Sequence, residues 1–146
     1  MTTKLYLVRH GQTCWNVEGR YQGQLDPPLT TRGRQQAIET ARQLATVGVS
    51  AIYSSDLARA YETAEVLAVV TGLPLQLYTR LREINQGQWQ GVLVDDIRTG
   101  WLEAFKAWEE HPWHNHPSSG ETLEQVQTRL FASIDEIATR RVCPRF

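Results

Sequence analysis

Three adjacent residues near the start of the chain, Arg9, His10 and Gly11, carry groups that could bind and attack a phosphate. They directly follow an apolar run in the stretch "LYLVRHGQTCWN". A guanidinium is a planar fork that matches phosphate oxygens, and a neutral imidazole is a nucleophile near neutral pH. A glycine leaves room for an anion to approach the backbone. A histidine after a strand is also often a turn residue with a backbone partner, so this segment favours phosphate chemistry over a metal without establishing it.

Two later segments could bring further charges to the same place. The stretch "SSDLARAYETA" puts Arg59 in the first turn of an expected helix, where backbone N–H groups also favour an anion. A lone arginine there would usually be a surface charge. The stretch "LREINQGQWQG" puts Glu83 just beyond an expected strand, where it could equally be a solvated loop carboxylate or a helix cap. Ligands bind beyond the carboxyl ends of parallel strands, so we expect these groups to meet at one sheet edge.

The elements that must position these residues alternate along the first half of the chain. Apolar runs predict strands, and helical spacing between Thr30 and Gly48 and again before Gly72 predicts two helices. The expected strands cover residues 4–8, 51–53 and 75–78. This βαβαβ order predicts a parallel sheet covered by helices with right-handed crossovers.

The second half of the chain has a different pattern of apolar residues. Apolar and aromatic residues predict one helix over about residues 95–110 whose stripe packs in the core or under a lid. The stripe consists of Ile97, Trp101, Leu102, Phe105 and Trp108. A cofactor or nucleic-acid platform is the alternative, but the helix lacks a matching basic face. A last helix is expected to open at Thr122, with Leu123, Val126, Leu130, Ile134 and Ile137 on one side.

Composition limits the function classes. The 146 residues, 41 % hydrophobic and 21 % charged, predict one globular domain over residues 1–146. A net charge of -1 gives no broad basic field for nucleic acid or an anionic membrane, and no apolar run reaches the ~20 residues that span a bilayer. Two cysteines, Cys14 and Cys143, do not suggest a disulfide framework. We therefore expect a cytoplasmic protein.

Three histidines in the loop "HPWHNHPSSGE" raise the question of a metal site. The prolines in this loop prevent His111, His114 and His116 from sharing one face of a helix at i, i+4 spacing. No acid or cysteine nearby completes a tetrahedral set of metal ligands. The sequence therefore predicts no metal site, and a loop near the pocket mouth that helps select substrates is the preferred interpretation.

The stretches "LVRHGQTCWNVEGRYQGQLDPPLTTRGRQQA", "SSDLARAYETA" and "LREINQGQWQG" resemble the successive motifs of the histidine phosphatase superfamily, the phosphoglycerate-mutase-like proteins. The resemblance covers nearly the whole chain. It implies a doubly wound α/β domain with a mainly parallel sheet and helices on both faces.

The same resemblance implies a role for each site residue. It makes His10 the residue that becomes phosphohistidine and Glu83 the proton donor to the leaving alkoxide, while Arg9 and Arg59 hold the phosphoryl oxygens. Binding residues would be Asn16, through its amide, and Gln22 with Gly23 in the "RYQGQLD" loop. No metal or other cofactor is required.

The implied function is hydrolysis of small phosphorylated metabolites through a phosphohistidine. Phosphoglycerate mutases of this family usually follow the glutamate with "RHYG" and a nearby lysine, whereas Glu83 is followed by "INQGQWQG", which favours hydrolysis. Mutase-type transfer and a phosphate-binding module without turnover are the alternatives. The expected partner is a small phosphorylated metabolite, with a homo-oligomer left open and neither nucleic acid nor membrane expected.

One departure from the family concerns the end of the sequence. The family usually carries a second histidine in an "SHG"-like motif on a strand after the final long helix, whereas here that helix is expected to end near Arg141, before "VCPRF". We therefore expect a C-terminally truncated chain. Losing one charge-stabilising group typically costs ~10²–10³ in rate. A missing strand would leave unpaired backbone groups at the sheet edge, which a partner chain or a domain swap could pair. A monomer in light scattering at high concentration would count against such pairing.

Overall fold

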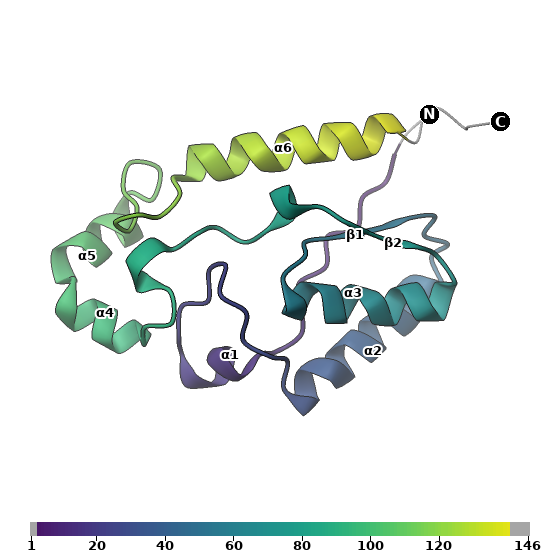
Figure 1. Ribbon diagram of the computed structural model, residues 1–146, viewed down its shortest axis with the longest axis horizontal. Helices are drawn as coiled ribbons and strands as arrows, with labels where there is room; N and C mark the ends of the chain where they lie inside the picture. Colours follow the sequence, from purple (N-terminus) through teal and green to yellow (C-terminus); the bar gives the residue numbers. More distant parts are fainter. Residues whose placement is uncertain (1–2, 141–146) are drawn as a thin grey trace.

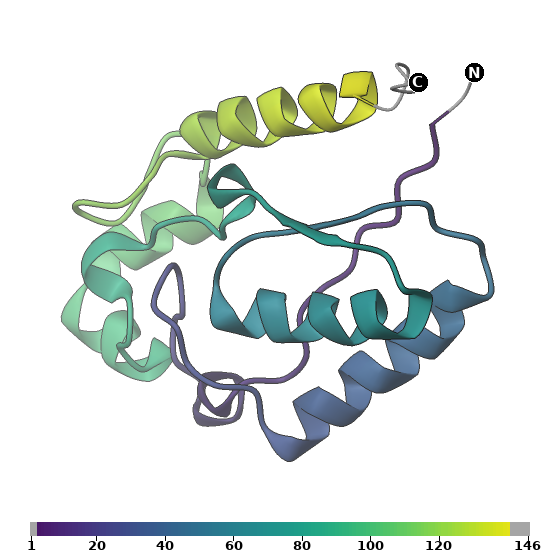
Figure 2. The same cartoon turned by 45° about the vertical axis from the view of Figure 1, so that its right-hand side comes forward.

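The computed structural model describes residues 3–140, and two parallel strands lie at its centre. Strands β1 (Ile52–Ser54) and β2 (Leu75–Leu77) pair in register from Ile52 with Leu75 to Ser54 with Leu77. Helix α3 (Ala58–Thr71) connects them and packs with helix α2 (Thr31–Ala45) on one side of the sheet. Figures 1 and 2 show helix α6 (Leu123–Arg140) crossing the opposite side. The α/β fold with helices on both faces is therefore confirmed.

The two helices beside the sheet begin where the sequence predicts, and α3 also ends there, whereas α2 ends at Ala45, before the expected stop at Gly48. The Thr30 side chain accepts the N–H of Gly33 at 3.0 Å and caps the start of α2. Gly72 ends α3 in the left-handed conformation. The short helix α1 (Cys14–Glu18) ends in the same way at Gly19, where φ is 74°. The core between the helices and the strands is built around Ala41, Ile52 and Leu67.

The expected strand over residues 4–8 is wrong. Residues 3–12 are extended but form no strand within the described part of the chain, and Leu7 is 90 % exposed. An apolar run reports only side-chain preference, whereas a strand also needs a neighbouring backbone to accept and donate its hydrogen bonds. This segment is the purple trace that runs beside the sheet toward α1 in Figure 1.

The predicted helix over residues 95–110 is two helices, α4 (Val94–Gly100) and α5 (Leu102–Glu110). The break falls at Trp101, directly after Gly100, a weak helix former. The aromatic stripe nevertheless packs as core. Trp89, in the 3-10 helix Gly87–Trp89, lies with Ile97 and Phe105 at the centre, and Trp101 and Trp108 flank them. Leu102 is the exception, since it faces solvent.

Helix α6 starts with the expected cap. The Thr122 hydroxyl oxygen accepts the N–H of Gln125 at 3.1 Å, and the Gln125 side-chain oxygen accepts the N–H of Thr122 at 2.9 Å. Before it, a second 3-10 helix, Thr79–Leu81, follows β2 and contacts α6. The expected end of the last helix near Arg141, Cys143 and the strand that would follow lie outside the described residues.

Substitutions should distinguish the buried residues of the apolar and aromatic stripe from its exposed residue, Leu102. We expect Ile97→Ala to lower the free energy of unfolding by about 2–5 kcal/mol, because it leaves a cavity at a side chain that is 0 % exposed. Leu102→Ala, at a position 46 % exposed on the adjoining helix, is the matched control and should cost less than about 1 kcal/mol. Urea denaturation measures both, and equal losses would contradict this assignment of the core.

Candidate active site

The imidazole of His10 is held by its own neighbour. Its Nδ1 atom lies 2.7 Å from the carbonyl oxygen of Gly11. A carbonyl oxygen can only accept, so Nδ1 carries the proton and donates it. In the neutral ring the other nitrogen, Nε2, then keeps a free lone pair. The half-buried ring therefore presents an unprotonated nitrogen that can act as a nucleophile.

The electrostatic surroundings keep this ring neutral. Burial lowers the pKa of His10, and the positive charges of Arg59 and Arg9 lower it further. The hydrogen bond to Gly11 and the negative charge of Glu83 raise it, but the net pKa lies below the ordinary 6.5. Arg9, Arg59 and Glu83 therefore all act electrostatically on His10 in the fold.

Gly11 is fixed from two sides. Its N–H donates to the Thr63 hydroxyl oxygen at 3.1 Å, and that hydroxyl donates to the carbonyl oxygen of Arg59 at 2.7 Å. A Cβ atom on Gly11 would lie 2.2 Å from the carbonyl oxygen of Gly33 in the first turn of α2. From the sequence, we expected the missing side chain of Gly11 to leave room for an anion. In the structure it leaves room for the backbone of α2.

Arg59 lies in the first turn of α3, as expected, but it is buried rather than exposed. Only 1 % of the residue is accessible. Its Nη1 and Nη2 atoms donate to the carbonyl oxygens of Leu25 and Gly23, both at 2.7 Å. Its Nε–H is buried and has no hydrogen-bond partner in the described part of the chain. An unsatisfied buried donor of this kind is uncommon and marks a place where a ligand oxygen could bind.

The loop that Arg59 holds is shaped for this contact. Gly23 has φ of +52°, and a Cβ there would lie 2.2 Å from the Gln90 side chain. The Asp26 carboxylate accepts the N–H of Ala58 at 2.8 Å and so caps the start of α3. The loop and the helix thus fix each other. Gly23, which the sequence placed near the substrate, here supplies a carbonyl oxygen that accepts a hydrogen bond from Arg59.

Glu83 lies past the carboxyl end of β2 and is exposed. Its Oε1 atom accepts the N–H of Ile84 at 2.8 Å. Its charge acts on both His10 and Arg59. The segment that carries it is tied to the end of β1 by an ion pair between Arg82 and Asp56.

Asn16 and Gln22 meet at Thr13 rather than at His10. Thr13 is fully buried. The Asn16 Oδ1 atom accepts the N–H of Thr13 at 2.9 Å, and the Thr13 hydroxyl lies 2.9 Å from the Gln22 side-chain oxygen. Within residues 3–140 neither side chain forms a hydrogen bond with His10, Arg9 or Arg59. The contacts of Asn16 use its amide oxygen and leave the amide nitrogen as a donor.

Two residues of α2 that sequence reasoning missed, Gln36 and Thr40, line a cavity beside His10, which Arg59 and Glu83 do not line. A cavity of about 260 Å³ has the segment 9–11 on one side and Gln36, Thr40 and Thr63 on the other. Gln36 and Thr40 are spaced i, i+4, which puts them on one helix face, but so do many exposed polar pairs. Nothing in their spacing singles them out from the sequence.

The histidine loop between α5 and α6 does not form a metal cluster. Among residues 3–140 no three His, Cys, Asp or Glu side chains converge to hold an ion. His116 Nδ1 instead lies 3.0 Å from the carbonyl oxygen of Pro117. The described helices also include none with the length and apolarity needed to cross a membrane.

The tautomer and pKa of His10 can be measured directly. We expect ¹⁵N NMR to show the proton on Nδ1 at pH 7 and a titration below 6.5. Because the folded state binds this proton less tightly than the unfolded chain does, His10 should lower the stability as pH falls below 6.5. A His10→Asn variant identifies the resonance. A pKa above 6.5, or a proton on Nε2, would contradict the geometry.

The chain is similar in sequence to members of one known family. The model of the histidine phosphatase superfamily (branch 1) matches residues 5–142. Phosphoserine phosphatase 1 of Hydrogenobacter thermophilus is 39 % identical over 94 % of this chain and 65 % of its own length. The probable phosphoglycerate mutase GpmB of Enterobacter sp. (strain 638) is 37 % identical over 90 % of this chain and 61 % of its own. The chain thus spans less than two thirds of the length of these curated relatives.

A solved structure extends the comparison to the fold. A mycobacterial glucosyl-3-phosphoglycerate phosphatase, in complex with VO3, superposes with a TM-score of 0.85 and is 41 % identical, covering 89 % of this chain and 64 % of its own. Sequence and structure therefore agree on the family suggested by the three motifs. The chain belongs to the histidine phosphatase superfamily.

Proposed function

We propose that this chain hydrolyses phosphomonoesters of small metabolites through a phosphohistidine formed on His10. The observation that carries the proposal is the hydrogen bond from His10 Nδ1 to the Gly11 carbonyl oxygen, which leaves Nε2 free in a ring with a lowered pKa. Nearby Arg9 and Arg59 supply positive charge for the equatorial oxygens of a phosphoryl group in transfer. The unpaired Nε–H of Arg59 is the donor best suited to one of those oxygens.

The reaction takes two displacements at phosphorus. In the first, the Nε2 lone pair forms the P–N bond, the ester P–O bond breaks, and its electron pair leaves on the alcohol oxygen, which takes a proton from Glu83. In the second, Glu83 accepts a proton from water, the water oxygen attacks phosphorus, and the P–N bond breaks to release phosphate. The Asn16 amide nitrogen and Gln22 complete the binding groups in this proposal.

The substrate class follows from the relatives. Two of them are named as phosphatases of phosphoserine and of glucosyl-3-phosphoglycerate, which are small phosphorylated metabolites. Transfer between two positions of a phosphoglycerate is the second candidate, because another relative is named as a probable phosphoglycerate mutase. The absence of "RHYG" after Glu83 favours hydrolysis.

A cytoplasmic site of action is part of the same proposal. Two supports for it come from the sequence: two cysteines do not suggest a disulfide framework, and the net charge of -1 offers no broad field for nucleic acid.

Hydrolysis of p-nitrophenyl phosphate in the presence of EDTA tests the function. We expect His10-dependent turnover at mildly acidic and neutral pH, which His10→Ala abolishes because it removes the nucleophile. His114→Ala, in the exposed loop between α5 and α6, is the matched control and should retain turnover. Equal turnover in His10→Ala would contradict the proposal. No turnover in the wild-type chain, with phosphate still bound, would support a binding module instead.

A further inference from the structure

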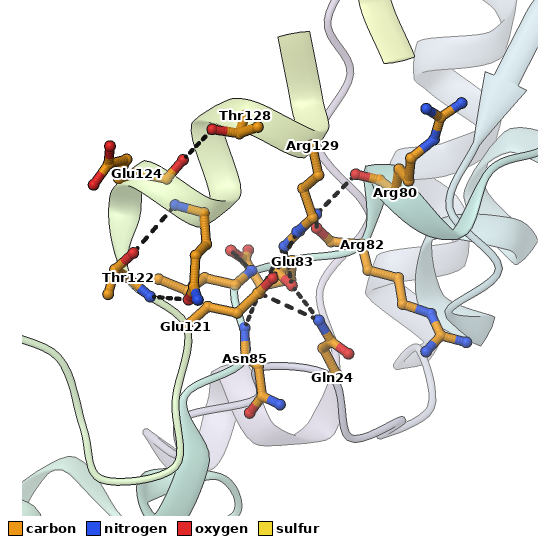
Figure 3. Close-up of polar contacts among 12 residues, drawn as sticks. Gln24, Arg80, Arg82, Glu83, Asn85, Glu121, Thr122, Glu124, Thr128 and Arg129 are labelled. Carbon is orange, nitrogen blue, oxygen red and sulfur yellow. Dashed lines mark hydrogen bonds and ion pairs between the residues drawn. The ribbon is translucent and has the colours of Figure 1, made fainter. Parts of the chain in front are cut away.

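One arginine of helix α6 forms hydrogen bonds with the backbone of the segment that carries Glu83. The Arg129 Nη1 atom donates to the carbonyl oxygens of Arg80 at 2.8 Å and Arg82 at 2.6 Å, and Nη2 donates to that of Glu83 at 3.0 Å. Figure 3 shows the guanidinium reaching from α6 into this segment. Three carbonyl groups of this segment, one of them in the 3-10 helix Thr79–Leu81, thus accept hydrogen bonds from a single side chain.

Glu121 fixes Arg129 and extends the contact along the chain. The Arg129 Nε and Nη2 atoms donate to Oε1 and Oε2 of Glu121, both at 2.8 Å, which makes a two-point ion pair. The Glu121 Oε2 atom also accepts the N–H of Asn85 at 2.8 Å, and the Glu121 N–H donates to the Asn85 carbonyl oxygen at 2.8 Å. The backbone is therefore anchored on both sides of the peptide that joins Glu83 to Ile84.

The ion pair is well shielded from solvent. The side chains of Arg129 and Glu121 are 17 % and 22 % exposed. Burial raises the pKa of Glu121, but hydrogen bonds from Arg129 and the Asn85 N–H outweigh it and hold the pKa below the ordinary value. Glu121 is therefore ionised at neutral pH, and removing either side chain would leave hydrogen-bonding groups in a partly buried site without their partner.

The carboxylate of Glu83 is oriented within this anchored segment. Its Oε1 atom accepts the N–H of Ile84, which belongs to the same peptide group as the Glu83 carbonyl that Arg129 binds. The Gln24 side-chain amide donates to the same Glu83 carbonyl oxygen at 3.0 Å from the opposite loop. A shift of this backbone would carry the carboxylate with it.

We propose that Arg129, held by Glu121, is a positioning residue that sets the place of the Glu83 carboxylate for proton transfer to the leaving oxygen. This inference rests on the proposed function. It adds that the last helix of the described chain acts on catalysis through the backbone of residues 80–85, without touching the substrate.

A series of substituted phenyl phosphates isolates this role. These substrates share one shape and differ mainly in the basicity of the leaving oxygen. Nitrophenolate leaves without a proton, whereas the more basic phenolate depends on an acid. The value of kcat/KM reports the steps up to departure of the leaving group, so it separates proton donation from the later attack of water.

We expect Arg129→Ala to lower kcat/KM on phenyl phosphate by about 10²-fold and on p-nitrophenyl phosphate by less than about 3-fold, because general acid catalysis typically contributes at least 10². Glu83→Gln should show the same selective loss. Arg129→Lys, which keeps the charge but not the fork of donors, should fall between the wild type and Arg129→Ala.

The matched control is Glu136→Gln. It removes the ion pair between Arg80 and Glu136, which also joins α6 to the turn after β2 but does not touch the Glu83 carbonyl. Its kcat/KM should stay close to that of the wild type on both substrates. Amide hydrogen exchange gives a readout besides activity, and Arg129→Ala should speed exchange at Ile84 and Asn85 but not at the paired strand residue Ser54.

The outcomes distinguish the inference from the function on which it rests. Equal loss on all phenyl phosphates, or unchanged exchange at Ile84 and Asn85, would overturn the positioning role while leaving the hydrolase intact. A wild-type chain without His10-dependent turnover would overturn the proposed function and this inference together.

Discussion

The hydrogen bond between His10 Nδ1 and the Gly11 carbonyl oxygen is the contact on which the account depends. It decides which ring nitrogen is free, and Gly11 is itself set by Thr63 and by close contact with Gly33. The imidazole is therefore oriented by α2 and α3, although the segment before it forms no strand in the described part of the chain. Two packed helices are sufficient to orient a group that stands on an otherwise exposed extended segment.

Two guanidiniums, that of the buried Arg59 and that of the partly buried Arg129, hold the loops around this histidine in a similar way. Arg59 donates hydrogen bonds to the carbonyl oxygens of Gly23 and Leu25 in a loop. Arg129 donates in the same way to the carbonyl oxygen of Glu83 in the turn after β2. A loop near a binding site cannot satisfy its carbonyl groups by strand pairing without closing the site. Side-chain donors satisfy them instead, and the positive charge of one of these donors, Arg59, also lowers the pKa of His10.

The sequence predicted the elements that depend on local pattern and missed those that depend on distant partners. The caps at Thr30 and Thr122 and the parallel pair of strands joined by a helix follow from short-range signals. The strand over residues 4–8 failed because pairing needs a neighbour that an apolar run cannot report. Arg129 was invisible for a related reason, since its backbone partners lie 46 to 49 residues earlier in the chain.

The central claim is that Nε2 of His10 attacks phosphorus, and rapid-quench trapping tests it most directly. The chain would be mixed with an aryl phosphate labelled in the phosphoryl group, quenched in alkali to preserve phosphohistidine, digested and mapped. We expect label on His10 as the Nε2-phosphorylated isomer, because Nδ1 donates to the Gly11 carbonyl oxygen. Label on Nδ1, on another residue, or nowhere during steady turnover would contradict it.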